Sequence, residues 1–154
     1  MTGAGGLTVA GELQLDAGAA ALRALLEDPE RLAAALPHVG ELVPDDDEPG
    51  AFAALVRPAL ALGEIPLRTR WRRVADAGGG LRWLVDGRGD EHAVALDARL
   101  VLEDRGDGAL ARWRVECRFT GTVRSVGQRV LGAIVDRQVR QVLQTADRLA
   151  VAGR

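Results

Sequence analysis

The stretch GTVRSVGQRVLGAIVDRQVRQVLQTADRLA, residues 121–150, decides the fold of this chain. It contains no proline and predicts one continuous helix of about 28 residues that begins near Thr122. Apolar residues recur in it at spacings of three to four residues or their multiples, which is typical of one face of a helix. That apolar stripe consists of Val123, Val126, Val130, Ile134, Val142 and Leu149. Such a helix needs a surface against which to pack.

Segments of alternating apolar and polar residues precede the helix. They cover residues 7–15, 67–74, 81–89, 92–104 and 109–119, and glycine- and aspartate-rich turns separate several of them. This alternation predicts strands with one apolar and one polar face. Residues 16–36 instead predict two short helices, the second capped by Asp28 and starting at Pro29. Residues 39–56 predict two more strands around the acidic run 45–48, which we expect to be a solvated hairpin tip rather than a cation site.

An antiparallel sheet with one apolar face must cover that face with another layer. Only the helix at 121–150 is long enough to do this. We therefore expect an α+β fold in which a curved antiparallel sheet of six to seven strands wraps around the long C-terminal helix, with two short helices after the first strand. The length of 154 residues predicts one domain over 1–154, with its core at about 7–150.

Composition narrows the class of protein. The net charge of −2 gives the whole chain no attraction to nucleic acid. The single Cys117 excludes an internal disulfide and a thiolate metal cluster. Neither a signal peptide nor an apolar run of membrane-spanning length is present in the sequence, so we expect a soluble, cytoplasmic protein.

Three motifs resemble those of a known family. The segment EDPERLAAALPHVGEL (27–42) is similar to an Asp-Pro-Glu, helix, Pro-Gly-x-x-x-Leu pattern, with His38 in place of the glycine. The segment GTVRSVGQRVLGAIVDR (121–137) is similar to a Gly-x-Leu-x-x-x-Gly-Gln-Arg helix start, and LALGEIPLRTRW (60–71) to a Val-Gly-Pro-Val turn, with Glu64 in place of the proline. From about residue 8 to 148, the chain resembles the CoxG family of carbon monoxide dehydrogenase subunits. This family belongs to the START/polyketide-cyclase-like (SRPBCC) superfamily, whose members have the helix-grip fold.

This resemblance implies a binding function. The superfamily uses a cavity between sheet and helix for lipids, quinones, sterols or polyketides. The CoxG family implies a carrier or an accessory, maturation or membrane-recruitment factor for a molybdenum hydroxylase of the carbon monoxide dehydrogenase type. The alternative is a polyketide cyclase- or dehydratase-like enzyme that acts on an apolar substrate.

Three tryptophans on the inward faces of three strands are the strongest candidates for a cavity wall, since large rings offer much apolar contact with few rotatable bonds. The alternative is that all three belong to an ordinary core. The predicted cavity residues are Leu67, Trp71, Trp83, Val94, Leu96, Trp113, Val115, Val130 and Ile134.

The sequence offers little for catalysis. It has no tyrosine, and its two histidines, His38 and His92, lack a partner at a recognisable spacing. We expect His38 to face solvent and His92 to be a structural residue with satisfied hydrogen bonds, although it could line a cavity. Cys117 lies on the apolar side of its strand and is expected to be a small core residue. The prediction is therefore no catalytic residue, no metal and no cofactor.

The last segment of the chain is basic. Residues 122–154 contain six arginines and two acidic residues, whereas residues 1–50 contain two arginines and ten acidic residues. The arginines of the helix predict either a solvated face or a surface for an acidic partner or anionic headgroups, and hence a peripheral position at the inner membrane face. The residues of this predicted face are Arg124, Arg129, Arg137 and Arg140.

Overall fold

The structure is a computed structural model and describes residues 5–36, 39–45, 47–57, 59–60, 63–64 and 66–153. His38, which is expected to face solvent, lies outside the described residues, as does Asp46 of the acidic run, and the side chain of Glu64 is likewise not described. The elements are, in order, β1 (Gly5–Leu15), α1 (Ala19–Glu27), α2 (Pro29–Ala35), β2 (Val39–Pro44), β3 (Ala51–Val56), β4 (Ala59–Leu60), β5 (Gly63–Glu64), β6 (Leu67–Val74), β7 (Leu81–Arg88), β8 (His92–Arg105), β9 (Gly108–Gly121), the short 3-10 helix η1 (Thr122–Val126) and α3 (Gln128–Ala152).

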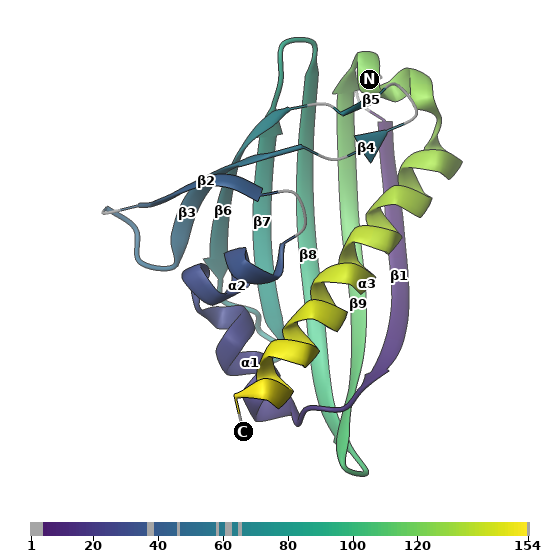
Figure 1. Cartoon of the computed structure of the whole chain (residues 1–154). Coiled ribbons are helices and arrows are strands. Elements are labelled where there is room, and N and C mark those ends of the chain that lie inside the picture. Colours follow the sequence, from purple (N-terminus) through teal and green to yellow (C-terminus); the bar gives the residue numbers. More distant parts are fainter. Residues whose placement is uncertain are drawn as a thin grey trace.

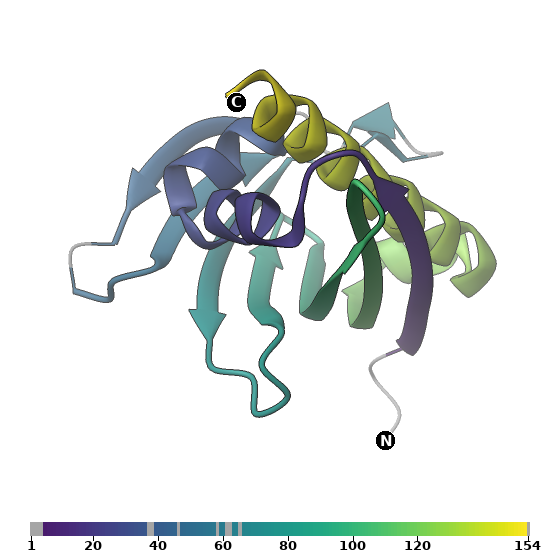
Figure 2. The same cartoon turned by 90° about the horizontal axis from the view of Figure 1, so that it is seen from below.

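Seven strands form one antiparallel sheet in the order β1-β9-β8-β7-β6-β3-β2, and β4 and β5 form a separate small hairpin. The sheet is strongly curved, and α3 crosses its concave side diagonally (Figure 1). Viewed along the perpendicular direction, all three α-helices lie on that same side of the sheet (Figure 2). The predicted α+β fold, with a curved sheet around a long C-terminal helix, is confirmed.

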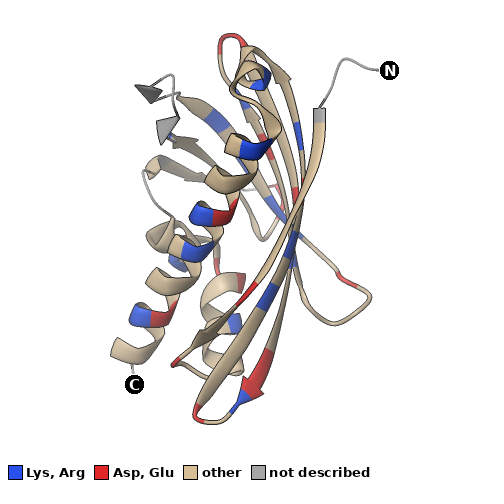
Figure 3. Cartoon of the chain, turned by 90° about the vertical axis from the view of Figure 1, so that its right-hand side faces the viewer, with Lys and Arg blue, Asp and Glu red and all other residues tan. Residues whose placement is uncertain are grey.

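The alternation of the strands produces two chemically different sheet faces. Along β9, every second side chain from Ala111 to Phe119 is buried, and the intervening residues Arg112, Arg114 and Arg118 are exposed. Basic and acidic residues recur along the strands of the sheet (Figure 3), and on the convex face Arg70 pairs with carboxylates of the acidic β2–β3 turn. The concave face is apolar and meets the helices.

The two short helices form where the sequence predicts them. Leu22, Leu25 and Leu26 of α1 are buried at helical spacing. Asp28 caps α2, because its Oδ1 accepts a hydrogen bond from the backbone N–H of Glu30 at 3.0 Å, and Pro29 occupies the first position. Both helices fill part of the space between α3 and the sheet.

The start of the long helix differs from the prediction. The chain forms η1 after Gly121, and Gly127, with φ +96°, then separates η1 from α3, which begins at Gln128 rather than near Thr122. A backbone at this φ cannot continue a right-handed helix. The break therefore resets the helical phase, and the face of α3 that is buried consists of Leu131, Leu143, Ala146 and Ala150. Among the described residues, no helix combines the length and the apolar character that crossing a membrane requires.

The C-terminal half of α3 is fastened to the segment between β1 and α1. The Asp147 carboxylate accepts hydrogen bonds from the backbone N–H of Asp16, at 3.1 Å to each oxygen, and of Ala17 at 2.8 Å. From the other side, Asp104 at the end of β8 accepts from the backbone N–H of Ala19 at 2.8 Å, in the first turn of α1. Asp104 thus satisfies a backbone donor that the start of α1 would otherwise leave unpaired, and Asp147 satisfies those of the two residues before the N-cap of this helix.

We predict that Asp147→Ala lowers the free energy of unfolding by about 1–3 kcal/mol, because it removes a charged acceptor from two backbone donors, one of which belongs to the fully buried Ala17. Urea unfolding measures the change. Gln144→Ala, at an exposed position on the same helix, is the matched control and should change stability by less than about 0.5 kcal/mol. An effect of Asp147→Ala as small as that of the control would contradict the fastening role.

Candidate functional site

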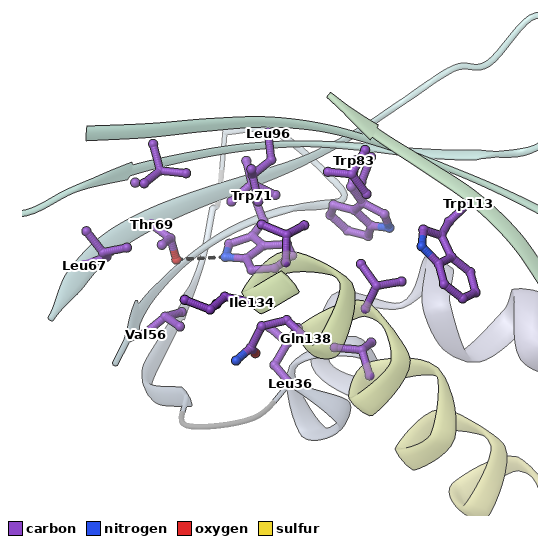
Figure 4. A pocket seen from close by; sticks show the side chains of 18 of the residues that line it. Leu36, Val56, Leu67, Thr69, Trp71, Trp83, Leu96, Trp113, Ile134 and Gln138 are labelled. Carbon is purple, nitrogen blue, oxygen red and sulfur yellow. Dashed lines mark hydrogen bonds between the residues drawn. The ribbon is translucent and has the colours of Figure 1, made fainter. Parts of the chain in front are cut away.

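An apolar cavity of about 270 Å³ lies between the concave face of the sheet and the helices (Figure 4). Side chains from α1, α2, β3, β6–β9, η1 and α3 line it, and nearly all of them are aliphatic or aromatic. Among the described residues, three polar side chains belong to this lining, those of Thr69, His92 and Gln138. Arg99 also borders the cavity, but its guanidinium lies on the convex face, 3.9 Å from the Asp97 carboxylate. The cavity volume is close to the lower end of the range of small-molecule pockets, roughly 300–1,000 Å³.

One wall of the cavity is aromatic. The Phe52 ring stacks on Trp71 with centroids 5.5 Å apart and an interplanar angle of 8°. Trp83 meets both rings edge-on, at 5.8 Å from Phe52 and 6.5 Å from Trp71. Phe52 lies opposite Trp71 in the β3–β6 register, so the pairing of the strands brings the two rings together. Edge-to-face and offset contacts of this kind hold large side chains in fixed positions.

The polar groups behind this wall are paired with one another. The Trp71 Nε1–H donates to Thr69 Oγ1 at 2.8 Å, and the Thr69 hydroxyl donates to the carbonyl oxygen of Ala54 at 2.7 Å. The first of these bonds is the dashed line in Figure 4. Trp83 Nε1–H donates to the carbonyl oxygen of Leu26 at 3.2 Å, which ties α1 to β7.

Trp113 forms another part of the lining and is held on two sides. It lies opposite Gly11 of β1, where a Cβ atom would come within 2.5 Å of the indole ring. The Arg140 guanidinium lies over the ring face, 4.9 Å from its centroid, and donates to the Asp136 carboxylate at 2.9 Å. The indole therefore packs directly on the β1 backbone beneath a cation.

The structure brings most of the predicted cavity residues together. Eight of them line the cavity, namely Leu67, Trp71, Trp83, Val94, Leu96, Trp113, Val115 and Ile134. The prediction for Val130 is wrong, since its side chain is 42% exposed and does not line the cavity. The break at Gly127 explains the error, because the phase of Val123 and Val126 does not carry over into α3.

On the helical side of the cavity, the sequence analysis predicts Ile134 but misses most of the lining residues. The lining residues that were not predicted include Leu26, Leu32, Leu36, Leu131, Val135, Gln138, Val139, Val142 and Leu143. The signal for those in α3 is the spacing of 131, 135, 138–139 and 142–143, which becomes the dominant stripe once the helix is started at Gln128.

The predicted basic face separates into two groups. Arg124, Arg129 and Arg137 are exposed on η1 and α3. Arg140 is only half-exposed, because its guanidinium lies over the Trp113 ring, and it pairs with Asp136. The expectation that Arg140 lies on a solvated or docking face is therefore corrected, because its guanidinium packs on a ring that lines the cavity.

His92 also differs from its prediction. It lines the cavity, and its Nδ1 is buried with no hydrogen-bond partner among the described residues. No group of three or more histidine, cysteine or acidic side chains in the described part of the chain is arranged to hold a metal ion.

The carboxylates whose pKa is lowered lie outside the cavity. A two-pronged hydrogen bond from Arg82, at 2.7 and 2.9 Å, lowers the pKa of Asp97 on the convex face, and backbone N–H donation from Asp47 lowers that of Asp45 in the β2–β3 turn.

A family model for the carbon monoxide dehydrogenase subunit CoxG matches residues 11–148, which include the whole cavity. The chain belongs to the CoxG family. No curated protein sequence matches it significantly.

Solved structures show how widely the fold of this CoxG-family protein occurs. A conserved protein from Geobacillus kaustophilus is similar with a TM-score of 0.82 at 16% identity, over 95% of this chain and 96% of that one. A START superfamily protein from Mycobacterium smegmatis has a TM-score of 0.68 at 11% identity, over 96% and 99% of the two chains. The di-domain ARO/CYC protein StfQ of the steffimycin biosynthetic pathway has a TM-score of 0.62 at 15% identity, over 97% of this chain and 53% of StfQ. At these identities the similarity is one of fold. The CoxG family and the apolar cavity together indicate a domain that binds a hydrophobic ligand.

Cys117 is buried beside the cavity wall and should be unreactive. Burial raises the pKa of its thiol from the ordinary 9.0 to about 11. At pH 8 we expect roughly one thiol in 1,000 to be ionised in the folded protein, against roughly one in ten when unfolded. Labelling with iodoacetamide should therefore be at least about 50-fold slower in the native state than in denaturant and should accelerate up to about pH 11.

The same shift affects stability at high pH. Because the unfolded thiol loses its proton first, the free energy of unfolding should fall as the pH rises from about 9 to 11. Cys117→Ser is the control for labelling at other sites. Fast native labelling with a plateau below pH 9 would show that the thiol is not buried in this way.

Proposed function

We propose that this CoxG-family protein binds an apolar small molecule, lipid- or quinone-like, in the cavity between the sheet and α3. The observation that carries the proposal is the cavity itself, whose lining is almost entirely aliphatic and aromatic. Burial of apolar surface contributes about 25 cal/mol per Å², so a ligand that fills this space gains affinity without any charged contact. We propose that the ligand is bound without being transformed, since the described lining residues include no carboxylate, thiol or serine hydroxyl, and His92 is their candidate for acid–base chemistry.

We further infer a carrier or accessory role for a molybdenum hydroxylase of the carbon monoxide dehydrogenase type, in the cytoplasm or at the inner face of the membrane. Family membership supports this inference. A protein that hands an apolar molecule to an enzyme needs a closed site during transit and a surface for docking, and the basic arginines near the start of α3 offer such a surface.

An enzymatic function is the alternative. The unpartnered Nδ1 of His92 at the cavity favours a cyclase- or dehydratase-like activity, in which an isolated imidazole would move a proton on an apolar substrate. If His92→Gln abolished turnover of such a substrate while leaving its binding unchanged, the binding-only proposal would fail.

The ligand proposal is tested by native mass spectrometry of the purified protein, followed by organic extraction of the bound molecule. We expect an adduct that disappears on denaturation. Ala98→Phe fills the cavity from β8 and should reduce the bound fraction by roughly tenfold or more, through steric exclusion. Ala95→Phe, on the opposite face of the same strand, is the matched control and should leave it unchanged. A protein that carries nothing and binds no added lipid or quinone would contradict the proposal.

The docking surface lies near the cavity. Val130, which is exposed, is one helical turn from Ile134, which lines the cavity, so this part of α3 forms the rim. Arg129 and Arg137 lie on the same part of the helix, and Arg124 lies in η1 just before it. An exposed valine between arginines matches the chemistry of an anionic membrane surface.

We predict that the protein co-sediments with anionic phospholipid vesicles at about 50 mM salt and much less at about 200 mM, since the Debye length falls from roughly 14 to 7 Å. Replacing Arg124, Arg129 and Arg137 by glutamine should abolish the binding. Replacing Arg68, Arg88 and Arg118 on the convex face removes the same charge and should have little effect. Equal losses in both triple variants would mean that net charge alone is responsible, and no binding by the wild type would refute the membrane surface.

A further inference from the structure

The three tryptophans of the cavity differ in what their indole N–H groups meet. Those of Trp71 and Trp83 donate to Thr69 and to the Leu26 carbonyl, as described above. Trp113 is only 4% exposed, so water does not reach its indole nitrogen. This buried Nε1 has no hydrogen-bond partner among the described residues. Buried donors without a partner are rare in folded proteins because each loses its hydrogen bonds to water without replacement.

The Trp113 ring cannot turn to find a partner. Gly11 lies against one edge of the indole, where even a methyl group would collide with it. Arg140 lies over its face and is itself held by Asp136. In this position the Nε1 of Trp113, which is itself a lining residue, lies on the side of the ring that faces Trp83 (Figure 4).

Few polar groups of the described lining could hold a water molecule that accepts a hydrogen bond from the Trp113 N–H. A buried water needs two to four polar partners. The Thr69 hydroxyl is already engaged with Trp71 and Ala54, and the Gln138 amide points away from Trp113 (Figure 4). His92 pairs with Gly121 whereas Trp113 pairs with Leu100, eight residues further along β8, so roughly 26 Å of strand separates these positions. The missing acceptor is therefore to be sought on the ligand.

We propose that the Trp113 Nε1–H donates a hydrogen bond to a neutral carbonyl oxygen of the bound molecule, so that the site selects apolar carbonyl compounds over hydrocarbons and fixes their orientation. This inference rests on the proposed binding function and adds the polar group of the ligand. The acceptor is neutral because a carboxylate buried against a single N–H would lose most of its hydration, while the nearby Arg140 is already paired with Asp136.

The test compares 2-undecanone with undecane, a pair that differs in one carbonyl oxygen. Their dissociation constants are measured by displacement of the neutral fluorescent probe N-phenyl-1-naphthylamine. Trp113→Phe retains an aromatic ring and removes the N–H. Trp83→Phe makes the same change at a tryptophan whose N–H already has a protein acceptor, and is the matched control. The quantity compared between variants is the ratio of the two dissociation constants. The difference in aqueous solubility between the two ligands contributes equally to this ratio in every variant and therefore cancels.

We expect the preference for the ketone over the alkane to fall by roughly two- to tenfold in Trp113→Phe and by less than about twofold in Trp83→Phe, as the loss of one neutral hydrogen bond predicts. Undecanoic acid should bind more weakly than the ketone. The inference is overturned, while the binding function stands, if Trp113→Phe weakens both ligands equally, if Trp83→Phe shifts the preference as much, or if the acid binds best. If the wild type binds neither ligand but carries or binds a lipid or quinone, this inference falls and the binding function stands; if it binds no apolar molecule at all, both proposals fall.

A measurement on the wild type avoids reliance on the folding of the variant. The chain has three tryptophans, so its proton–nitrogen NMR spectrum contains three indole N–H signals, and Trp71→Phe and Trp83→Phe identify the third by elimination. Saturation with 2-undecanone should move the Trp113 indole proton downfield, whereas undecane should leave it near its ligand-free position. Identical shifts with both ligands would overturn the proposed hydrogen bond.

Discussion

The sheet has one apolar face, and α3 alone is too narrow to cover it. Seven strands side by side are wider than one helix, so the sheet curves toward α3, and α1 and α2 fill one side of the space that remains. Curvature brings Trp83, Val85 and Val115 toward α3. The side chains of the sheet and of the helix nevertheless do not pack against one another over the whole interface. The cavity is the part of the apolar face that no helix reaches. Its apolar character therefore follows from the same alternation that makes the strands.

The convex face shows the other consequence of that alternation. Arg82, Arg99 and Arg114 lie opposite one another on β7, β8 and β9, an arrangement that would be repulsive in isolation. Asp97 and Glu116 on the same face lie within 4 Å of these guanidiniums and compensate their charges. Exposed pairs of this kind add little stability, in general about 0–1 kcal/mol. A charged outer face also disfavours burial against another apolar surface, because the charges would lose their hydration.

How much of the structure can be predicted from the sequence depends on whether a feature is set by neighbouring residues or by contacts between residues distant in the chain. Strand alternation is local, and it was enough to predict the sheet, the helix that covers it and the inward positions of Trp71, Trp83 and Trp113. The phase of α3 was misread because one residue, Gly127, interrupts the helix, and Val130 was assigned to the wrong side as a result. Arg140 and His92 were misjudged for a different reason. Whether a guanidinium lies on a ring or an imidazole nitrogen lacks a partner depends on residues distant in the chain, such as Gly11 and Trp113, and no spacing encodes it.

The position of β1 has a consequence for the way in which the chain acquires its structure. This strand lies at one edge of the sheet and pairs only with β9, so that Gly5 meets Phe119 and Leu15 meets Ala109. During synthesis, at about 5–20 residues per second, β1 is made first and then waits several seconds for its partner. Closing a loop of this length is entropically costly and slows folding. The meander from β6 to β9, whose neighbours follow one another directly, can assemble earlier, and β1 and α3 then complete the structure together. Until that moment the backbone N–H and C=O groups of β1 remain unpaired and its inward apolar side chains remain exposed, which makes the unfinished chain prone to aggregation.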